Sequence, residues 1–377
     1  MSPQEMEIAE QTQETMEEMY VNMGPQHPST HGVLRLLLKL DGEVVTEVIP
    51  YIGYLHRCHE KIGENRTYTQ IIPYTDRLDY LASMYNNFGY VLTVERLIGI
   101  VVPERAEYMR VILGELQRIA SHLIWLGTLG LDLGNFTIFM YAFREREKIL
   151  DLFESVSGQR LNYAFYRIGG MPLDFPDSFL ADCKAFLEWF KPRLPEYDAL
   201  MSDNIIFQKR VQGLGKLDAK TAIDYAISGP MLRASGIKWD LRRNDPYSIY
   251  DRFEFDIPVG TSGDVWDRYM VRRIEMDESV KIVEQALQGL PPGEIIGKVP
   301  KKLKPPVGDI YTRVESPRGE LGFYLVSDGS EKPYRYKVRS PAFVNLSVLP
   351  VIGRGCLVAD IVAILGSIDI VLGEVDR

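Results

Sequence analysis

Two histidines stand in one stiff segment, GPQHPSTHG at residues 24–32. Pro25 and Pro28 restrict the backbone there, and the flanking glycines permit close backbone approach. Such a loop can hold two imidazole rings in fixed positions. Because imidazole binds transition metals, His27 and His31 are candidate metal ligands.

The metal alternative lacks further ligands. No cluster of Cys, His or carboxylate residues follows His27 and His31 at a ligand-like spacing. The three cysteines, Cys58, Cys183 and Cys356, lie far apart and form no CxxC pair. We therefore expect neither a metal site nor a disulfide framework, and a reducing cytoplasmic environment. On these residues alone, the histidines could equally well satisfy nearby backbone groups.

A second set of polar groups interrupts an apolar helical pattern. Glu115, Arg118 and His122 are spaced by three and four residues, which places them on one side of a helix and predicts an internal ionic network. The charged run FREREK, residues 143–148, is typical of a solvated helix face. The same face could instead bind a neighbouring subunit.

Long amphipathic helices are expected to position these groups, and together they predict a central helix bundle. The first begins at Thr75 or Asp76, with Leu78, Leu81, Met84, Tyr85, Phe88 and Leu92 on one side. The others follow Pro103, run from Asn135 to Ser157–Gly158, run from Asp177 to Pro192 or Pro195, and run from Asp264 to Gly289.

Strand signals flank the helices on both sides in sequence. Residues 33–40 and 43–49 predict a β-hairpin around Asp41–Gly42, and a second hairpin is expected around Asp328–Gly329. Residues 297–309 have the composition of a linker, and a short helix is expected over 357–365.

The predicted fold is α+β with four parts. They are an arm that is disordered or docked on a partner (1–19), a hairpin with the histidine loop (20–72), a helical bundle (73–296), and a linker with a C-terminal β/α segment (297–377).

Composition narrows the function further. The chain has 377 residues, 46% of them hydrophobic and 25% charged, which suits a globular protein. Its net charge of -9 disfavours nucleic acid as a partner. The most apolar stretch, residues 111–133, carries Glu115, Arg118, His122 and Asp132, so no membrane span is expected. Residues 1–19 lack the basic and apolar regions of a signal peptide, and they are not a transit segment.

Several long motifs, in order, resemble the 49-kDa subunit of respiratory complex I along nearly the whole chain. They are GPQHPSTHGVLR, GYLHRCHEKIGENRTY, YTDRLDY, LDLGNFTIFMYAFREREKILDLFE, SGPMLRASGIKWDLR, ESPRGELGFYLVSDG and VADIVAILGSIDIVLGEVDR. That family is similar in fold to the large subunit of nickel–iron hydrogenases, whose metal is held by paired cysteines. Here Cys58 has no Cys three residues away and the ending GEVDR has none, so hydrogenase chemistry is not expected.

The resemblance implies a quinone chamber with named residues. It places His31 and Tyr80 at the two ends of the quinone headgroup, where both can donate hydrogen bonds and protons to the carbonyl oxygens. It also places Asp132 beside His31, where the carboxylate would favour the protonated ring. Without the resemblance, Tyr80 would be interpreted as a core residue, because Met84, Asn87 and Val91 follow it at helical spacing.

The resemblance also places Arg57 close to an iron–sulfur cluster of a neighbouring subunit. The residues alone allow an ordinary salt bridge from Arg57 to Glu60. Pro172 occupies a position where some family members have histidine, and proline cannot titrate. The implied partners are the cluster-bearing subunit, the C-type 30-kDa subunit, a ferredoxin-like subunit and the membrane subunit that forms the quinone chamber.

The expected function is therefore reduction of a membrane quinone within a proton-translocating NADH:quinone oxidoreductase, peripheral to the bacterial plasma membrane on its cytoplasmic side. This chain would bind no cofactor itself, and NADH would bind elsewhere, since no dinucleotide fingerprint follows a strand. The network of Glu115, Arg118 and His122 is a candidate for proton coupling. The alternatives are a scaffold subunit without chemistry, or the same role in a relative driven by ferredoxin or deazaflavin.

Overall fold

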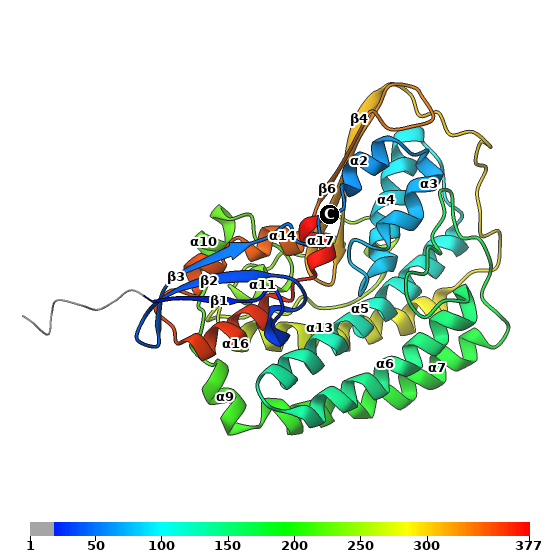
Figure 1. Cartoon of the computed structure of the whole chain (residues 1–377). Helices are drawn as coiled ribbons and strands as arrows, with labels where there is room; N and C mark the ends of the chain where they lie inside the picture. Colours follow the sequence, from blue (N-terminus) through cyan, green and yellow to red (C-terminus); the bar gives the residue numbers. More distant parts are fainter. Residues whose placement is uncertain (1–18) are drawn as a thin grey trace, which may run out of the picture.

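The computed structural model describes residues 19–377, so the predicted arm lies outside the described residues except for Met19. The fold is mixed, as predicted, with long helices and two three-stranded antiparallel sheets. Figure 1 shows the long helices as one layer, with both sheets lying to one side of it. The division into four parts stays a prediction.

The first sheet contains the predicted hairpin. Strands β2 (Arg35–Asp41) and β3 (Val44–Tyr51) pair around Gly42, whose φ of 59° suits the tight turn. Alternate residues Leu36, Leu38 and Leu40 are buried on one face. A third strand, β1 (Met19–Met23), was not predicted and pairs with β2. Strand β3 packs against the C-terminal helix α15 (Leu349–Ile352), and the 3-10 turn Pro28–Thr30 packs against α16 (Val358–Ile368).

Four long helices confirm the predicted bundle: α5 (Glu104–Asp132), α6 (Phe136–Ser157), α7 (Phe179–Phe190) and α13 (Val265–Gly289). The Asn135 side chain caps α6 by accepting the N–H of Ile138, and Asp264 caps α13 in the same way. Helix α5 packs against both α6 and α13 and is buried on nearly all sides. It is the central element of the molecule.

The charged run on α6 is only partly solvated. Arg144, Glu147 and Lys148 are exposed, as expected for a surface face. Glu145 is instead fully buried and accepts hydrogen bonds from Arg144. The interpretation of the run as a surface face is therefore confirmed for Arg144, Glu147 and Lys148 and is wrong for Glu145.

The prediction that a helix begins at Thr75 or Asp76 is wrong. Helix α3 (Tyr68–Thr75) ends where that helix was expected to begin, and α4 (Ser83–Ile98) starts later. Residues 76–82 form turns, in which the Asp79 carboxylate accepts the N–H of Leu81. Side-chain acceptors of this kind compete with helical hydrogen bonds, which explains the break.

The second sheet contains the other predicted hairpin, β5 (Gly319–Ser327) with β6 (Arg335–Arg339). Strand β4 (Gly308–Ser316) was not predicted and begins at the end of the expected linker. Helix α4 covers this sheet on one side, and α2 (His59–Glu64) packs against β6. A tight turn at residues 317–318 connects β4 to β5.

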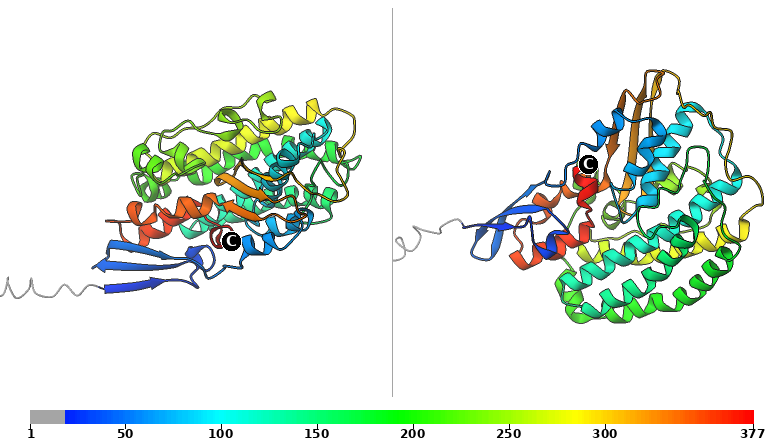
Figure 2. Two further views of the ribbon diagram at one scale, coloured as in Figure 1. Left: turned by 90° about the horizontal axis from the view of Figure 1, so that it is seen from above. Right: turned by 45° about the vertical axis from the view of Figure 1, so that its right-hand side comes forward.

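The C-terminal segment lies between the two sheets (Figure 1). Its helices are α14 (Pro341–Leu346), α15 (Leu349–Ile352), α16 (Val358–Ile368) and α17 (Leu372–Asp376), and α16 confirms the short helix expected there. Figure 2 shows α16 between the first sheet and the long helices. Shorter helices complete the chain: α8 (Leu194–Tyr197), α9 (Ile205–Val211), α10 (Ala219–Asp224), α11 (Pro230–Ala234) and α12 (Leu241–Asn244).

Candidate functional site

The two loop histidines have different surroundings. His27 is exposed and its Nδ1 accepts the N–H of Ser29, so it caps the short 3-10 turn Pro28–Thr30. His31 ends that turn in the left-handed conformation, with φ 54°, and its Nε2 lies 3.1 Å from Oδ2 of Asp132. His27 therefore satisfies a nearby backbone group, as one interpretation of the sequence allowed. His31 instead contacts a side chain of another element, Asp132. Among residues 19–377, no three His, Cys, Asp or Glu side chains gather as ligands for a metal ion.

The His31–Asp132 pair lies where four segments meet. Asp132 is the last residue of α5, and the two side chains are 15% and 10% exposed. Gly366 of α16 packs against them, since a Cβ placed there would lie 3.8 Å from Nε2 of His31 and 3.6 Å from Oδ2 of Asp132. Leu372 of α17 covers the adjacent Gly32. The pair is thus packed against α16 and remains partly exposed to solvent.

Tyr80 lies in the turn before α4 and not on a helix face, so its interpretation as a core residue is wrong. Its side chain is 37% exposed. Partial burial and the neighbouring Asp79 raise the pKa of Tyr80, so its hydroxyl stays protonated and can donate at neutral pH. No group within residues 19–377 hydrogen-bonds to that hydroxyl.

Helix α17 connects the histidine loop to the turn that carries Tyr80. On one side Leu372 touches Gly32, and on the other a Cβ on Gly373 would lie 2.7 Å from the carbonyl oxygen of Leu78. The glycine therefore allows α17 to lie directly on the Tyr80 turn. The structure brings His31 and Asp132 into contact, and α17 contacts both the loop that carries His31 and the turn that carries Tyr80.

Arg57 does not form the salt bridge to Glu60 that its residue type allows. Its guanidinium donates to the carbonyl oxygen of Arg77 at 2.6 Å, while Glu60 pairs with Arg335 and Lys337. The segment before Arg57 is held by the C-terminal residues, because the Asp376 carboxylate accepts the N–H groups of Gly53 and Leu55. A charged hollow of about 360 Å³ lies beside this segment, lined by His56, Cys58, Glu60, Lys61, Arg335, Lys337, Asp376 and Arg377.

Glu115 is the centre of a fully buried polar cluster. Its carboxylate lies 3.1 Å from both Arg118 Nε and Arg242 Nη1. Three hydroxyl groups also donate to it, those of Tyr85, Tyr250 and Ser279. Burial alone would raise the pKa of Glu115, but Arg118 and Arg242 lower it to about 2, so the carboxylate stays ionised.

His122 joins this cluster only through residues that sequence reasoning missed. Its Nε2 lies 2.8 Å from Glu275, which pairs with Arg233 at 2.6 Å. Arg233 in turn lies 3.6 Å from Asp240, and Asp240 pairs with Arg242. Burial lowers the pKa of His122 despite Glu275, so the ring is neutral at pH 7. No sequence signal marked these residues, because the share of charged residues in SGPMLRASGIKWDLR is ordinary for the chain and Glu275 lies 153 residues from His122.

Comparisons with known proteins agree with the motifs. The family described as "Respiratory-chain NADH dehydrogenase, 49 Kd subunit" matches residues 132–306 and 298–377. An NADH-quinone oxidoreductase subunit of Dehalococcoides mccartyi is 60% identical over 96% of this chain and 99% of its own. The corresponding proteins from Desulforamulus reducens and Bacillus anthracis, which carry the same name, are 55% and 54% identical, each over 96% of this chain and 98% and 99% of their own.

The chain belongs to the 49-kDa subunit family of respiratory-chain NADH dehydrogenases. As a member, it is a subunit of an oxidoreductase and has other subunits of that enzyme as partners. None of the helices in the described part of the chain combines the length and apolar character that a membrane span requires.

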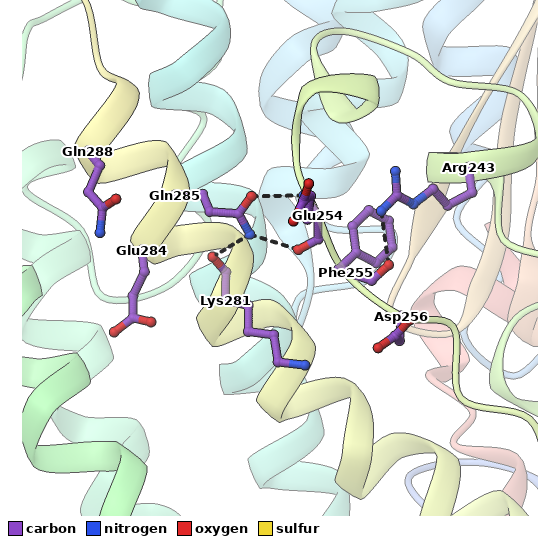
Figure 3. A pocket seen from close by; sticks show the side chains of 8 residues that line it. All are labelled: Arg243, Glu254, Phe255, Asp256, Lys281, Glu284, Gln285 and Gln288. Atoms are coloured by element: carbon purple, nitrogen blue, oxygen red, sulfur yellow. Dashed lines mark hydrogen bonds between the residues drawn. The ribbon is translucent and has the colours of Figure 1, made fainter.

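A larger surface hollow is lined by none of the residues that the family resemblance assigns to a site. It measures about 530 Å³ and lies between α13 and residues 254–256 (Figure 3). Some of its polar groups bond to one another: the Gln285 amide pairs with both backbone groups of Glu254, and Arg243 donates to the carbonyl oxygen of Phe255.

Proposed function

We propose that this subunit binds the headgroup of a membrane quinone between His31 and Tyr80 and forms the place where the quinone is reduced. The observation that carries the proposal is the 3.1 Å contact of a partly exposed His31 with Asp132. A donor held by one carboxylate and open on its other side suits an incoming carbonyl oxygen.

The proposed chemistry consumes two electrons and two protons per quinone and yields the quinol. An iron–sulfur cluster of a neighbouring subunit would supply the electrons, and this chain would hold no cofactor of its own. His31 and Tyr80 would donate hydrogen bonds to the two carbonyl oxygens and then pass protons to them. Asp132 would stabilise the positive charge of the protonated His31 ring before transfer.

The proposal extends to the surroundings of the site. Arg57, which is exposed and within residues 19–377 bonded only to a backbone carbonyl, would face the neighbouring cluster and favour its reduced state. The partners would be the cluster-bearing, C-type 30-kDa, ferredoxin-like and membrane quinone-chamber subunits, on the cytoplasmic side of a bacterial plasma membrane. The names of the relatives support the coarser statement, that the chain is one subunit of a larger NADH dehydrogenase.

The deciding experiment measures quinone reduction by the membrane-assembled complex carrying Tyr80→Phe or His31→Ala. Reduction of the iron–sulfur chain is followed separately by its spectroscopic signal. We expect quinone reduction to fall by about a hundredfold with cluster reduction intact, since positioned proton donors contribute about that much. His27→Ala, in the same loop, and Tyr225→Phe, with similar exposure at 39%, are matched controls and should behave as wild type.

Unchanged quinone reduction in both variants would contradict the proposal and favour a scaffold subunit without chemistry. The electron donor of the whole complex is a separate question. Activity with NADH, with reduced ferredoxin and with reduced deazaflavin cofactor, each offered to the wild-type complex, separates those alternatives.

The buried cluster around Glu115 and His122 would couple quinone chemistry to proton translocation. We expect Arg118→Lys, which keeps the charge and changes the hydrogen bonds, to lower the number of protons translocated per electron while electron transfer continues. An unchanged ratio in vesicles containing the assembled variant would contradict this role.

A further inference from the structure

One buried arginine joins the surroundings of both proposed quinone contacts. Arg318 stands in the turn between β4 and β5, and its side chain is directed inward and fully buried. Its Nη1 donates to Oδ2 of Asp79 at 2.6 Å and to the Ser121 hydroxyl of α5 at 3.2 Å. Its Nε and Nη2 donate to the carbonyl oxygen and to Oδ1 of Asp369, at 2.9 and 3.1 Å.

The two carboxylates that Arg318 binds stand next to the two ends of the site. Asp79 immediately precedes Tyr80 and shapes its turn through the N–H of Leu81. Asp369 ends α16 in the left-handed conformation, three residues after Gly366, which packs on the His31–Asp132 pair. A shift of Arg318 would therefore move Tyr80 and α16 relative to each other.

Arginine is suited to this position for geometric reasons. The planar guanidinium presents five N–H donors in a fixed arrangement, so it can hold four acceptors from three segments at once. A lysine would keep the charge but has one flexible ammonium group. Removing the charge would leave Asp79 and Asp369 buried with little compensation, since Arg272 Nε approaches Asp369 only to 4.0 Å.

We propose that Arg318 is a positioning residue, which fixes the spacing between Tyr80 and the His31–Asp132 pair and so sets how the quinone headgroup is held. The inference rests on the proposed function. Arg318 touches neither the headgroup nor the reacting protons, and it acts through Asp79 and Asp369. Its loss should therefore change binding and reduction of quinone without affecting the steps that reduce the clusters.

The test is the kinetics of the assembled complex with Arg318→Lys, using a short-chain quinone as substrate. We expect the KM for quinone to rise by about tenfold and kcat to fall, because a displacement of about 1 Å at a reacting group has effects of this size or larger. Cluster reduction should be unchanged. Arg110→Lys is the matched control: Arg110 is also fully buried and pairs with Glu95 at 2.6 Å, away from the site. Equal changes in KM for the two variants would overturn the proposal.

A double-mutant cycle then asks whether Arg318 acts through Tyr80. In a Tyr80→Phe background the effect of Arg318→Lys on the quinone KM should shrink to about twofold or less. Fully additive effects would overturn the positioning role while leaving the quinone site in place. If Tyr80→Phe alone changes nothing, it is the proposed function that fails.

Asp369→Asn covers the case in which Arg318→Lys does not assemble. This isosteric change keeps Arg318 and weakens its bond to the end of α16, along with the longer 4.0 Å contact of Asp369 with Arg272. We expect a KM increase in the same direction and smaller in size. An unchanged KM in an assembled Asp369→Asn complex would overturn the proposal.

Discussion

The His31–Asp132 pair and the buried cluster around Glu115 use similar residues in opposite ways. In the part of the chain that the structure describes, each member of the pair has a single ionic partner, and both remain partly exposed, at 15% and 10%. Glu115 is fully buried, with two arginines and three hydroxyl groups bonded to it. A buried carboxylate bonded to five neighbouring groups stabilises the fold, whereas a partly exposed ion pair has bonding capacity left for a substrate.

The largest effect on stability should come from removing the charge of the buried Glu115. Glu115→Gln leaves Arg118 and Arg242 buried without their shared carboxylate, and loss of one partner of a buried ion pair costs about 3–5 kcal/mol. We expect the variant subunit to be nearly absent from the assembled complex, as measured by native gel electrophoresis and heat inactivation. Normal assembly and an unchanged inactivation midpoint would show that the cluster contributes little to stability.

The matching change in the partly exposed His31–Asp132 pair is Asp132→Asn. Because this carboxylate is partly exposed and has one partner, we expect stability to change by less than about 1 kcal/mol. Quinone reduction should fall by about tenfold or more, since His31 loses the carboxylate that holds its ring in place. Quinone kinetics and heat inactivation of the same preparation provide the test. If the variant loses stability but keeps its quinone kinetics, Asp132 serves the fold and not the substrate, which would contradict this prediction.

Glu374 of α17 is an intermediate case and gives a pH-dependent prediction. It is buried, yet its Oε1 has no hydrogen-bond partner among the described residues. Burial and the nearby Asp79 raise its pKa from 4.5 to about 8, although Arg318 opposes this. The folded state therefore binds a proton more tightly than the unfolded state. The stabilisation is complete below about pH 4.5 and is lost as the pH rises through about 8.

Glu374→Gln should remove that dependence. Between about pH 5 and 8 the wild-type complex should lose heat stability, and the variant should lose less over the same range. Parallel inactivation midpoints for wild type and variant at each pH would contradict the assignment. Glu294→Gln, an exposed glutamate before the linker, serves as the control for the loss of one charge.

The smallest effect should come from Gly366→Ala, which adds one methyl group beside the pair. Its Cβ would lie 3.1 Å from Leu129 and 3.8 Å from His31, so a small shift can accommodate it. We expect a stability change below about 1 kcal/mol and a quinone KM raised by about twofold. Gly127→Ala, similarly tight at 3.3 Å but facing α6, should leave the KM unchanged. Equal effects from the two substitutions would mean that Gly366 matters only for packing.

Local patterns predicted the long helices and both hairpins, because apolar periodicity and capping residues such as Asn135 and Asp264 act within a few residues. The turn that carries Tyr80 was missed, since it depends on Asp79 and on Arg318, which lies 239 residues away. Strands β1 and β4 were missed because their partner strands, rather than their own residues, make them strands. The assignments of His31, Tyr80 and Asp132 came from family resemblance. Among these three residues, the structure shows a direct contact only between His31 and Asp132.

The position of α16 and α17 has a consequence for biosynthesis. Residues 366–377 pack on the histidine loop, hold the segment before Arg57 through Asp376, and touch the Tyr80 turn. These early-translated loops cannot reach their final arrangement until residues 366–377 have left the ribosome. A chain released before residue 366 would present an unfinished surface, so neighbouring subunits that recognise this region would incorporate only chains translated beyond that point.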